Sequence, residues 1–137
     1  MKNLILCGAV LALAACSAPA PLGPRVDTTP GPALSSSEIR ELVVGKTGFG
    51  TITGSTIEYA MYIAPDGTAL SRLPAGPVRR QDKGQWRLTN DNQLCLRWQT
   101  YRAGEEYCHR VHRQGQALRL QGESSAEILT FQNGNLI

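Results

Sequence analysis

The sequence from Lys46 onward consists of short runs in which apolar and polar residues alternate, and Gly, Asn and Asp separate the runs. Alternation with a period of two is typical of strands that bury one face, and these three residues favour turns. The runs predict eight strands, near residues 47–53, 56–63, 68–73, 84–89, 93–98, 106–113, 116–122 and 125–132. We therefore expect a mainly β fold, a small antiparallel meander that forms a barrel or a sandwich.

Two cysteines and one turn set the register of the later strands. Placing Cys95 opposite Cys108 pairs Leu94 with His109, and we expect these two cysteines to form a disulfide. A two-residue turn at Gln114-Gly115 pairs the next two strands. Both registers give one apolar face, which a slip by one residue would split. That face contains Leu94, Leu96, Trp98, Tyr107, Val111, Leu118 and Leu120, and an odd-length turn after Leu88 adds Trp86 and Leu88.

One short helix is predicted before the strands, over residues 35–44. Ser35 and Glu38 form an S-x-x-E capping box, and Gly45 is suited to the position after the helix. Ile39 and Val43 share one helical face. A helix this short is stable only when that face packs on something else, so we expect it to cap the β domain of residues 35–137.

The first sixteen residues have the pattern of a bacterial export signal. A basic residue, Lys2, precedes an uncharged apolar run that is too short to span a membrane and ends at Cys16. The sequence Leu13-Ala14-Ala15-Cys16 resembles the lipobox of bacterial lipoproteins. The resemblance implies that residues 1–15 are a signal peptide, that Cys16 is acylated with palmitate-type chains, and that the protein is anchored at the periplasmic face of a membrane. In lipoproteins an Asp after the cysteine favours the inner membrane, so Ser17 favours the outer membrane.

The segment from residue 16 to residue 34 is rich in proline, which favours an extended chain. We expect a disordered tether, and eighteen residues at about 3.1 Å each would span about 55 Å. Without the signal peptide the formal charge falls from +3 to +2, because Lys2 is lost. This charge is too small to indicate a nucleic-acid partner.

A second resemblance covers about a quarter of the chain. The stretch "GQWRLTNDNQLCLRW…YCHRVHRQGQALRL" carries Trp86, Cys95, Trp98 and Cys108. It resembles small periplasmic β proteins of unknown function in alphaproteobacteria. The resemblance implies a compartment and a fold, and it implies no activity.

Two candidate binding sites follow from the predicted faces. The outer face of four strands carries a cationic stripe, which could bind an envelope protein or an anionic glycan or lipid; the alternative is a solvated face that keeps the domain soluble. The stripe consists of Arg87, Arg97, Arg110, Arg119 and His112. On the inner face, Trp98, Tyr107 and His109 could line a ligand pocket, or they could be ordinary core residues.

The motifs for catalysis, metals and cofactors are incomplete. Gly45-Lys46-Thr47 resembles the end of a phosphate-binding loop, but Arg40 stands where that motif needs glycine. A zinc site is disfavoured because His109 points away from the face of Cys108 and His112, and the latter two lie about 13 Å apart along a strand. We therefore expect a protein that is not an enzyme and holds no cofactor or metal.

These observations predict an anchored, non-catalytic domain that presents its surface to a protein or envelope component. The alternative is a carrier that holds a small apolar ligand inside the barrel. A carrier requires a continuous apolar cavity, whereas the surface-binding domain can have an interior filled by side chains.

Overall fold

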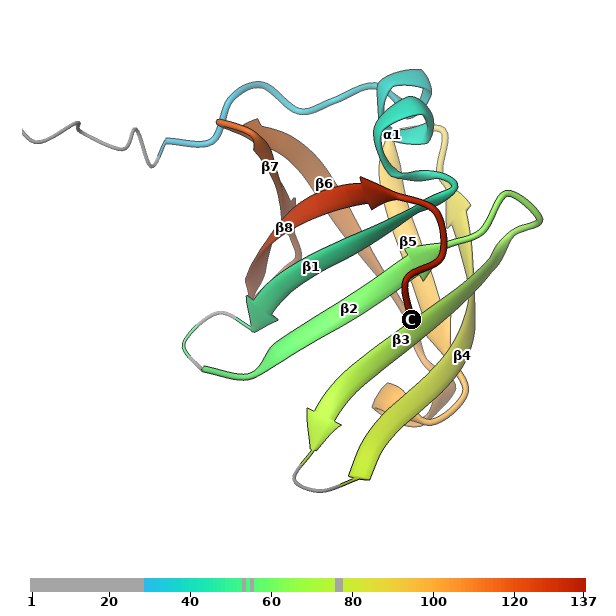
Figure 1. The fold of residues 1–137 in the computed structure, drawn as a ribbon. Coiled ribbons are helices and arrows are strands. Elements are labelled where there is room, and N and C mark those ends of the chain that lie inside the picture. The colour runs from blue at the N-terminus through green and yellow to red at the C-terminus, as the bar shows by residue number, and fades with distance from the viewer. Residues whose placement is uncertain (1–28, 53, 55, 76–77) are drawn as a thin grey trace, which may run out of the picture.

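A computed structural model describes residues 29–52, 54, 56–75 and 78–137. Eight antiparallel strands form one closed barrel, in which each strand pairs with the next and the last pairs with the first (Figure 1). The strands are β1 (Lys46–Ile52), β2 (Glu58–Ile63), β3 (Thr68–Ala75), β4 (Val78–Leu88), β5 (Gln93–Trp98), β6 (Glu106–Gln114), β7 (Ala117–Gln121) and β8 (Ala126–Asn133). The predicted mainly β barrel with one short α-helix is confirmed, and the predicted signal peptide and the predicted acylation site at Cys16 lie outside the described residues.

The predicted inner face is also confirmed. Cys95 pairs with Cys108 and Leu94 with His109, as the cysteine register requires. Leu88 pairs with Leu94 across a turn of odd length. All nine apolar side chains predicted for this face are buried or half-buried. The pairing of successive strands therefore gathers these side chains into one core.

The turn between β6 and β7 differs from the predicted one by one residue. Gln114 pairs with Ala117, so the turn residues are Gly115 and Gln116, and the predicted turn at Gln114-Gly115 is wrong. Gly115 has a φ of 60°. The first position of a type II′ turn takes a positive φ and favours glycine. The strand register changes by two residues, which leaves every side chain on its predicted face.

Strand β4 begins at Val78, six residues before the predicted start at Gly84. The added residues are largely polar and did not show the alternation of a core strand. They pair with β3 along its length, with Ser71 opposite Asp82. Polar residues are tolerated at inward positions here because this end of the barrel surrounds a cavity, which is described below.

The helix α1 (Ser36–Val43) covers one end of the barrel (Figure 1). Its capping box is complete: the Ser35 backbone N–H donates to the Glu38 carboxylate, and the Ser35 hydroxyl accepts from the Glu38 N–H. Ile39 and Val43 are fully buried in the core. Within the described residues, no helix is long and apolar enough to cross a membrane.

The end of the predicted tether is ordered, which corrects its boundary at residue 34. The Gly31 N–H donates to the Arg113 carbonyl and the Leu34 N–H donates to the Val111 carbonyl. Leu34 is only 5% exposed. Strand β5 reaches β6 only as far as Arg110, so the backbone groups of β6 beyond that point are free to pair with this segment. The prediction for residues 16–28 lies outside the described part of the chain.

Candidate functional site

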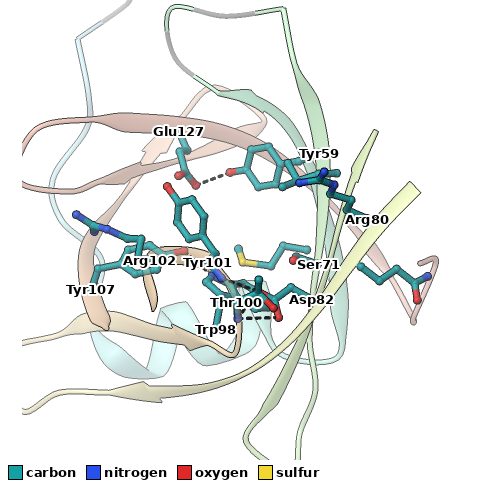
Figure 2. A pocket seen from close by; sticks show the side chains of 13 residues that line it. Tyr59, Ser71, Arg80, Asp82, Trp98, Thr100, Tyr101, Arg102, Tyr107 and Glu127 are labelled. Atoms are coloured by element: carbon teal, nitrogen blue, oxygen red, sulfur yellow. Dashed lines mark hydrogen bonds between the residues drawn. The ribbon is translucent and has the colours of Figure 1, made fainter. Parts of the chain in front are cut away.

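A cavity of about 600 Å³ lies inside the barrel, at the end away from α1 (Figure 2). It is bounded by the first residues of β2, β4, β6 and β8 and by the last residues of β3 and β5. Its apolar and aromatic lining consists of Tyr59, Met61, Leu73, Trp98, Tyr101 and Tyr107. Its polar lining consists of Ser71, Arg80, Gln81, Asp82, Thr100, Arg102 and Glu127.

The floor of the cavity depends on a glycine in β4. A Cβ atom at Gly84 would lie 2.7 Å from the Trp98 ring and 2.5 Å from the Arg97 carbonyl oxygen. A side chain at this inward position would therefore collide with the neighbouring strand and with the indole. The absence of a side chain lets the Trp98 ring lie across β4 at the bottom of the cavity.

One loop brings two side chains to the cavity mouth. It is the short 3₁₀ segment η1 (Tyr101–Gly104), which follows β5. The Asp82 carboxylate accepts hydrogen bonds from the backbone N–H groups of Thr100 at 3.1 Å and Tyr101 at 2.9 Å. Arg102 and Ala103 have φ values of 54° and 53°, in the left-handed region that non-glycine residues rarely adopt. Asp82 thus holds a strained loop that carries Tyr101 and Arg102.

Aromatic contacts order the side of the cavity next to this loop. The Trp98 Nε1–H donates to the Tyr107 hydroxyl at 2.6 Å. The Tyr101 ring meets the Tyr107 ring edge-on, with 5.9 Å between centroids. The Arg102 guanidinium lies over the Tyr107 ring, 5.1 Å from its centroid. Burial is the main cause that raises the pKa of Tyr107, so its hydroxyl is neutral and keeps its proton.

A carboxylate faces the cavity from the opposite side. Glu127 lies on β8 and accepts a hydrogen bond from the Tyr59 hydroxyl on β2 (Figure 2). Burial raises the pKa of Glu127, and the hydrogen bond from Tyr59 opposes this shift. Burial also raises the pKa of Tyr59, which therefore acts as a neutral donor. Among the side chains that the structure describes, no cation forms an ion pair with Glu127.

The three predicted pocket residues separate into two groups. Trp98 and Tyr107 line the cavity, whereas His109 does not. His109 points inward but is 2% exposed, and its ring meets the Tyr107 ring edge-on at 5.1 Å. Neither of its nitrogens has a hydrogen-bond partner among the described residues. Burial, with a smaller contribution from the charge of Arg102, lowers its pKa to about 4.

Sequence reasoning missed the far wall of the cavity. Glu127 shares the inward parity of Leu129 and Phe131 on β8, and Tyr59 shares that of Met61 on β2. A glutamate at an inward position of an otherwise apolar strand was the available signal. It was weak because the pairing of β8 with β1, which brings β8 toward β2, depends on closure of the barrel.

The predicted cationic stripe lies on the outer face but is partly engaged. Arg87 binds the Glu106 carboxylate through two hydrogen bonds, at 2.9 and 2.7 Å. Arg97 lies opposite the same glutamate on the neighbouring strand. Arg119 donates to Gln121, and the His112 ring bonds to the Gly31 carbonyl. Arg110 is exposed, so the stripe offers less free charge than its five members suggest.

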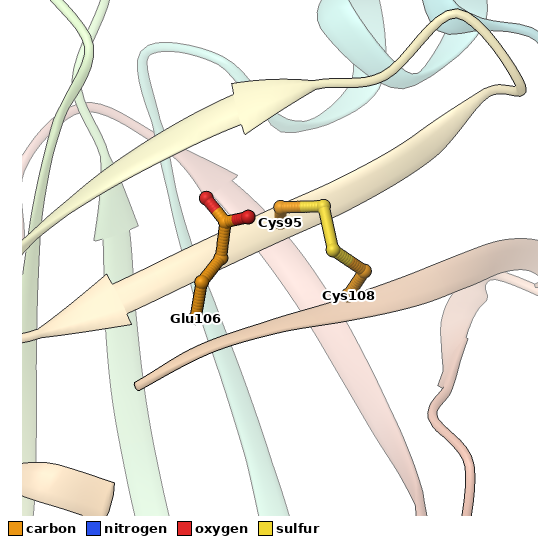
Figure 3. A group of neighbouring side chains, drawn as sticks. All are labelled: Cys95, Glu106 and Cys108. Carbon is orange, nitrogen blue, oxygen red and sulfur yellow. A yellow bond between two sulfur atoms is a disulfide. The ribbon is translucent and has the colours of Figure 1, made fainter. Parts of the chain in front are cut away.

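A group of potential metal ligands lies on the same face (Figure 3). Cys95, Glu106 and Cys108 bring two sulfurs and a carboxylate oxygen within 4.8 Å of one another. The sulfurs are joined in the predicted disulfide, which links β5 to β6. Metals bind thiolates, and neither sulfur is one here. Glu106 forms an ion pair with Arg87, so this group consists of a disulfide that links two strands and a neighbouring ion pair.

The cavity thus combines an aromatic and aliphatic wall with two carboxylates, those of Asp82 and Glu127, and with two exposed guanidinium groups at its mouth. The Asp82 carboxylate is engaged by backbone N–H groups. Such a combination suits the binding of a small molecule whose orientation is set by a few polar contacts.

Comparisons of the chain with models of protein families, with curated proteins and with solved structures find no match.

Proposed function

We propose that this protein binds a small, largely apolar molecule in the open end of its barrel and performs no reaction on it. The proposal rests on the cavity of about 600 Å³, in which six of the thirteen lining residues are aromatic or aliphatic. Protein sites for small ligands commonly have volumes of about 300–1,000 Å³ and mostly apolar walls. This function is the carrier, which the sequence analysis gave as the alternative to the surface-binding domain.

The outer face supports the other function less well. Binding of an anionic partner by the stripe would use Arg87 and Arg97, but Arg87 already forms an ion pair with Glu106, and Arg97 lies opposite the same glutamate. An ion pair at an exposed surface contributes about 1 kcal/mol at most, so a partner could displace it, but at a cost in affinity. The cavity needs no such displacement.

The polar groups of the cavity support binding rather than catalysis. Asp82 is committed to backbone N–H groups of the η1 loop. Glu127 accepts from Tyr59, whose pKa is raised and which therefore does not act as a base near neutral pH.

We also propose that the chain is exported and anchored through acylated Cys16 at the periplasmic face of the outer membrane. The lipobox-like sequence supports this, and so does the disulfide, because disulfides persist in oxidising compartments. The test is mass spectrometry of the protein purified from its native membrane. A mature chain that begins at Cys16 and carries acyl mass is expected; a chain that begins at Met1 without lipid would contradict the proposal.

Binding in the cavity can be tested with the neutral dye N-phenyl-1-naphthylamine, which fluoresces strongly in apolar surroundings. We expect a saturable rise in fluorescence with the wild-type protein. Ser71→Trp places an indole in the cavity and should weaken binding about tenfold or more, which corresponds to about 1.4 kcal/mol. Ile128→Trp is the matched control, because Ile128 is exposed on the outer face. Equal binding by both variants would show that the dye does not occupy the cavity.

A further inference from the structure

We propose that the ligand of this cavity carries a cationic group, such as an ammonium, which binds the carboxylate of Glu127 between the tyrosine rings. This inference rests on the proposed ligand-binding function and specifies its chemical class. Three observations support it: the environment of Glu127, the aromatic side chains around it, and the exposure of the two arginines at the mouth.

Glu127 is a half-buried carboxylate whose hydrogen-bond partner is a neutral group. Its pairing neighbour on β7 is the buried Leu120, and Tyr59 donates to it. Taking a carboxylate out of water is costly unless a cation or several donors compensate. An ammonium group at this point would supply the missing charge, and it would also lower the pKa of Glu127 toward the ionised form.

The side chains around this carboxylate also suit a cation. Tyr59, Tyr101, Tyr107 and Trp98 line the same cavity, and the faces of such rings attract ammonium and guanidinium groups. Arg102 already uses one of these faces, since its guanidinium lies 5.1 Å from the Tyr107 centroid. The aromatic wall therefore holds a cation of the protein itself, next to the space where the ligand would lie.

The two arginines at the mouth attract anions, whereas Glu127 attracts cations. Which attraction is stronger depends on how far each charge is exposed to water. Arg80 and Arg102 are exposed, so water and salt screen their charges. Glu127 is half-buried, and electrostatic interactions there are stronger. We therefore expect Glu127, and not the arginines, to decide the charge of the bound ligand. Binding of an anion is the opposite outcome of the same experiment.

The test uses three probes that share a naphthalene ring and differ in one group: naphthalen-2-ylmethanamine, naphthalen-2-ylmethanol and naphthalene-2-carboxylate. Their affinities for the folded, disulfide-bonded protein are measured by isothermal titration calorimetry at neutral pH. We expect the amine to bind about tenfold or more tightly than the alcohol, the range expected for a hydrogen bond to a charged group, and the carboxylate to bind most weakly.

Two conservative variants locate the effect. Glu127→Gln keeps an acceptor for Tyr59 and should remove the preference for the amine while changing the affinity of the alcohol less than about threefold. Arg102→Gln removes the cation over Tyr107 and should raise the affinity of the amine relative to that of the carboxylate. Both variants are checked for folding by near-ultraviolet circular dichroism. If Glu127→Gln does not fold, the order of the three affinities in the wild-type protein alone tests whether the cavity prefers a cation.

The outcomes separate this proposal from the proposed function. Tightest binding of the carboxylate, lost in Arg102→Gln, would overturn the cationic ligand and assign an anionic one. Equal binding of all three probes would also overturn it and leave a cavity that binds apolar rings without regard to charge. Failure of all three to bind would reject the ligand-binding function itself.

Discussion

Two titratable side chains, those of His109 and Glu127, point into the interior of this barrel, where a filled core would have apolar residues. His109 is buried with both ring nitrogens unpartnered among the described residues, and Glu127 faces the cavity with a neutral donor. Interior histidines and carboxylates of this kind make stability depend on pH, because their charged and neutral forms fit the folded state differently. Predictions about single residues can therefore be tested by titration.

His109 is expected to destabilise the protein in acid. Its pKa is about 4 in the folded state and 6.5 without the fold, so the folded state favours the neutral ring. The neutral His109 ring therefore makes its full contribution to the free energy of unfolding above about pH 6.5, and this contribution is lost as the pH falls toward 4. Linkage gives a loss of about 2 kcal/mol between pH 7 and pH 5. Urea unfolding at both pH values measures it.

His109→Leu is the control for this prediction. Other groups, such as Asp66 and Glu106, have lowered pKa values and also reduce stability in acid, in the variant and in the wild type alike. The variant should therefore lose about 2 kcal/mol less than the wild type over the same interval. Parallel losses in the two proteins would contradict the role assigned to His109.

Gly84→Ala tests the close contact beneath Trp98. The added methyl group would lie 2.5 Å from the Arg97 carbonyl oxygen and 2.7 Å from the indole, so we expect a loss of about 1–3 kcal/mol in the free energy of unfolding. The neighbouring substitution Gln85→Ala is on the exposed face and should change stability by about 0.5 kcal/mol or less. Equal stability of Gly84→Ala and wild type would show that β4 and β5 can separate without cost.

Among the elements, the strands were more predictable than the loops. Seven of the eight strands begin and end within about two residues of the alternating runs, because each of these strands faces core or cavity on one side and water on the other. The start of β4 was missed because its inward residues, such as Asp82, face the cavity and not an apolar core. The η1 loop and the pairing of residues 31–34 with β6 depend on contacts between distant segments, which no local pattern contains.

Asp82→Ala is expected to loosen the η1 loop. The substitution removes the acceptor for the N–H groups of Thr100 and Tyr101, and we expect a loss of about 1–3 kcal/mol in stability together with weaker binding of the naphthalene probes. Hydrogen exchange of the Tyr101 amide should become faster. Asp66→Ala is the matched control, since Asp66 holds Thr68 in the β2–β3 turn away from the cavity. Asp66→Ala should leave probe binding unchanged. Equal effects of both variants on binding would contradict a role of the η1 loop in holding the ligand.

For the molecule as a whole, closure of the barrel gives every strand two neighbours and leaves the disulfide as an additional link between β5 and β6. The fold class and the cysteine pairing could be predicted because both follow from alternation and from one register. The cavity could not, because its volume depends on how side chains from six strands and a loop fill the space after closure. A pattern of inward positions predicts which residues meet, but not how completely they fill the barrel.

Removing the disulfide tests its contribution to global stability. The double variant Cys95→Ala with Cys108→Ala should lose about 3 kcal/mol, the value for a loop of this length when the bond acts by restricting the unfolded chain. The register of β5 and β6 is held by several other residue pairs, so the circular dichroism spectrum should not change. Unaltered stability in urea would show that the bond does not restrict the unfolded state.

The segment of residues 31–34 joins the barrel on the side of α1 (Figure 1), whereas the residues that line the cavity lie toward the other end. The segment that leads into the barrel and the entrance of the cavity therefore lie at opposite ends of the barrel. Entry and exit of a ligand at this mouth are therefore not obstructed by residues 31–34, and substitutions in that segment should leave the entrance unchanged.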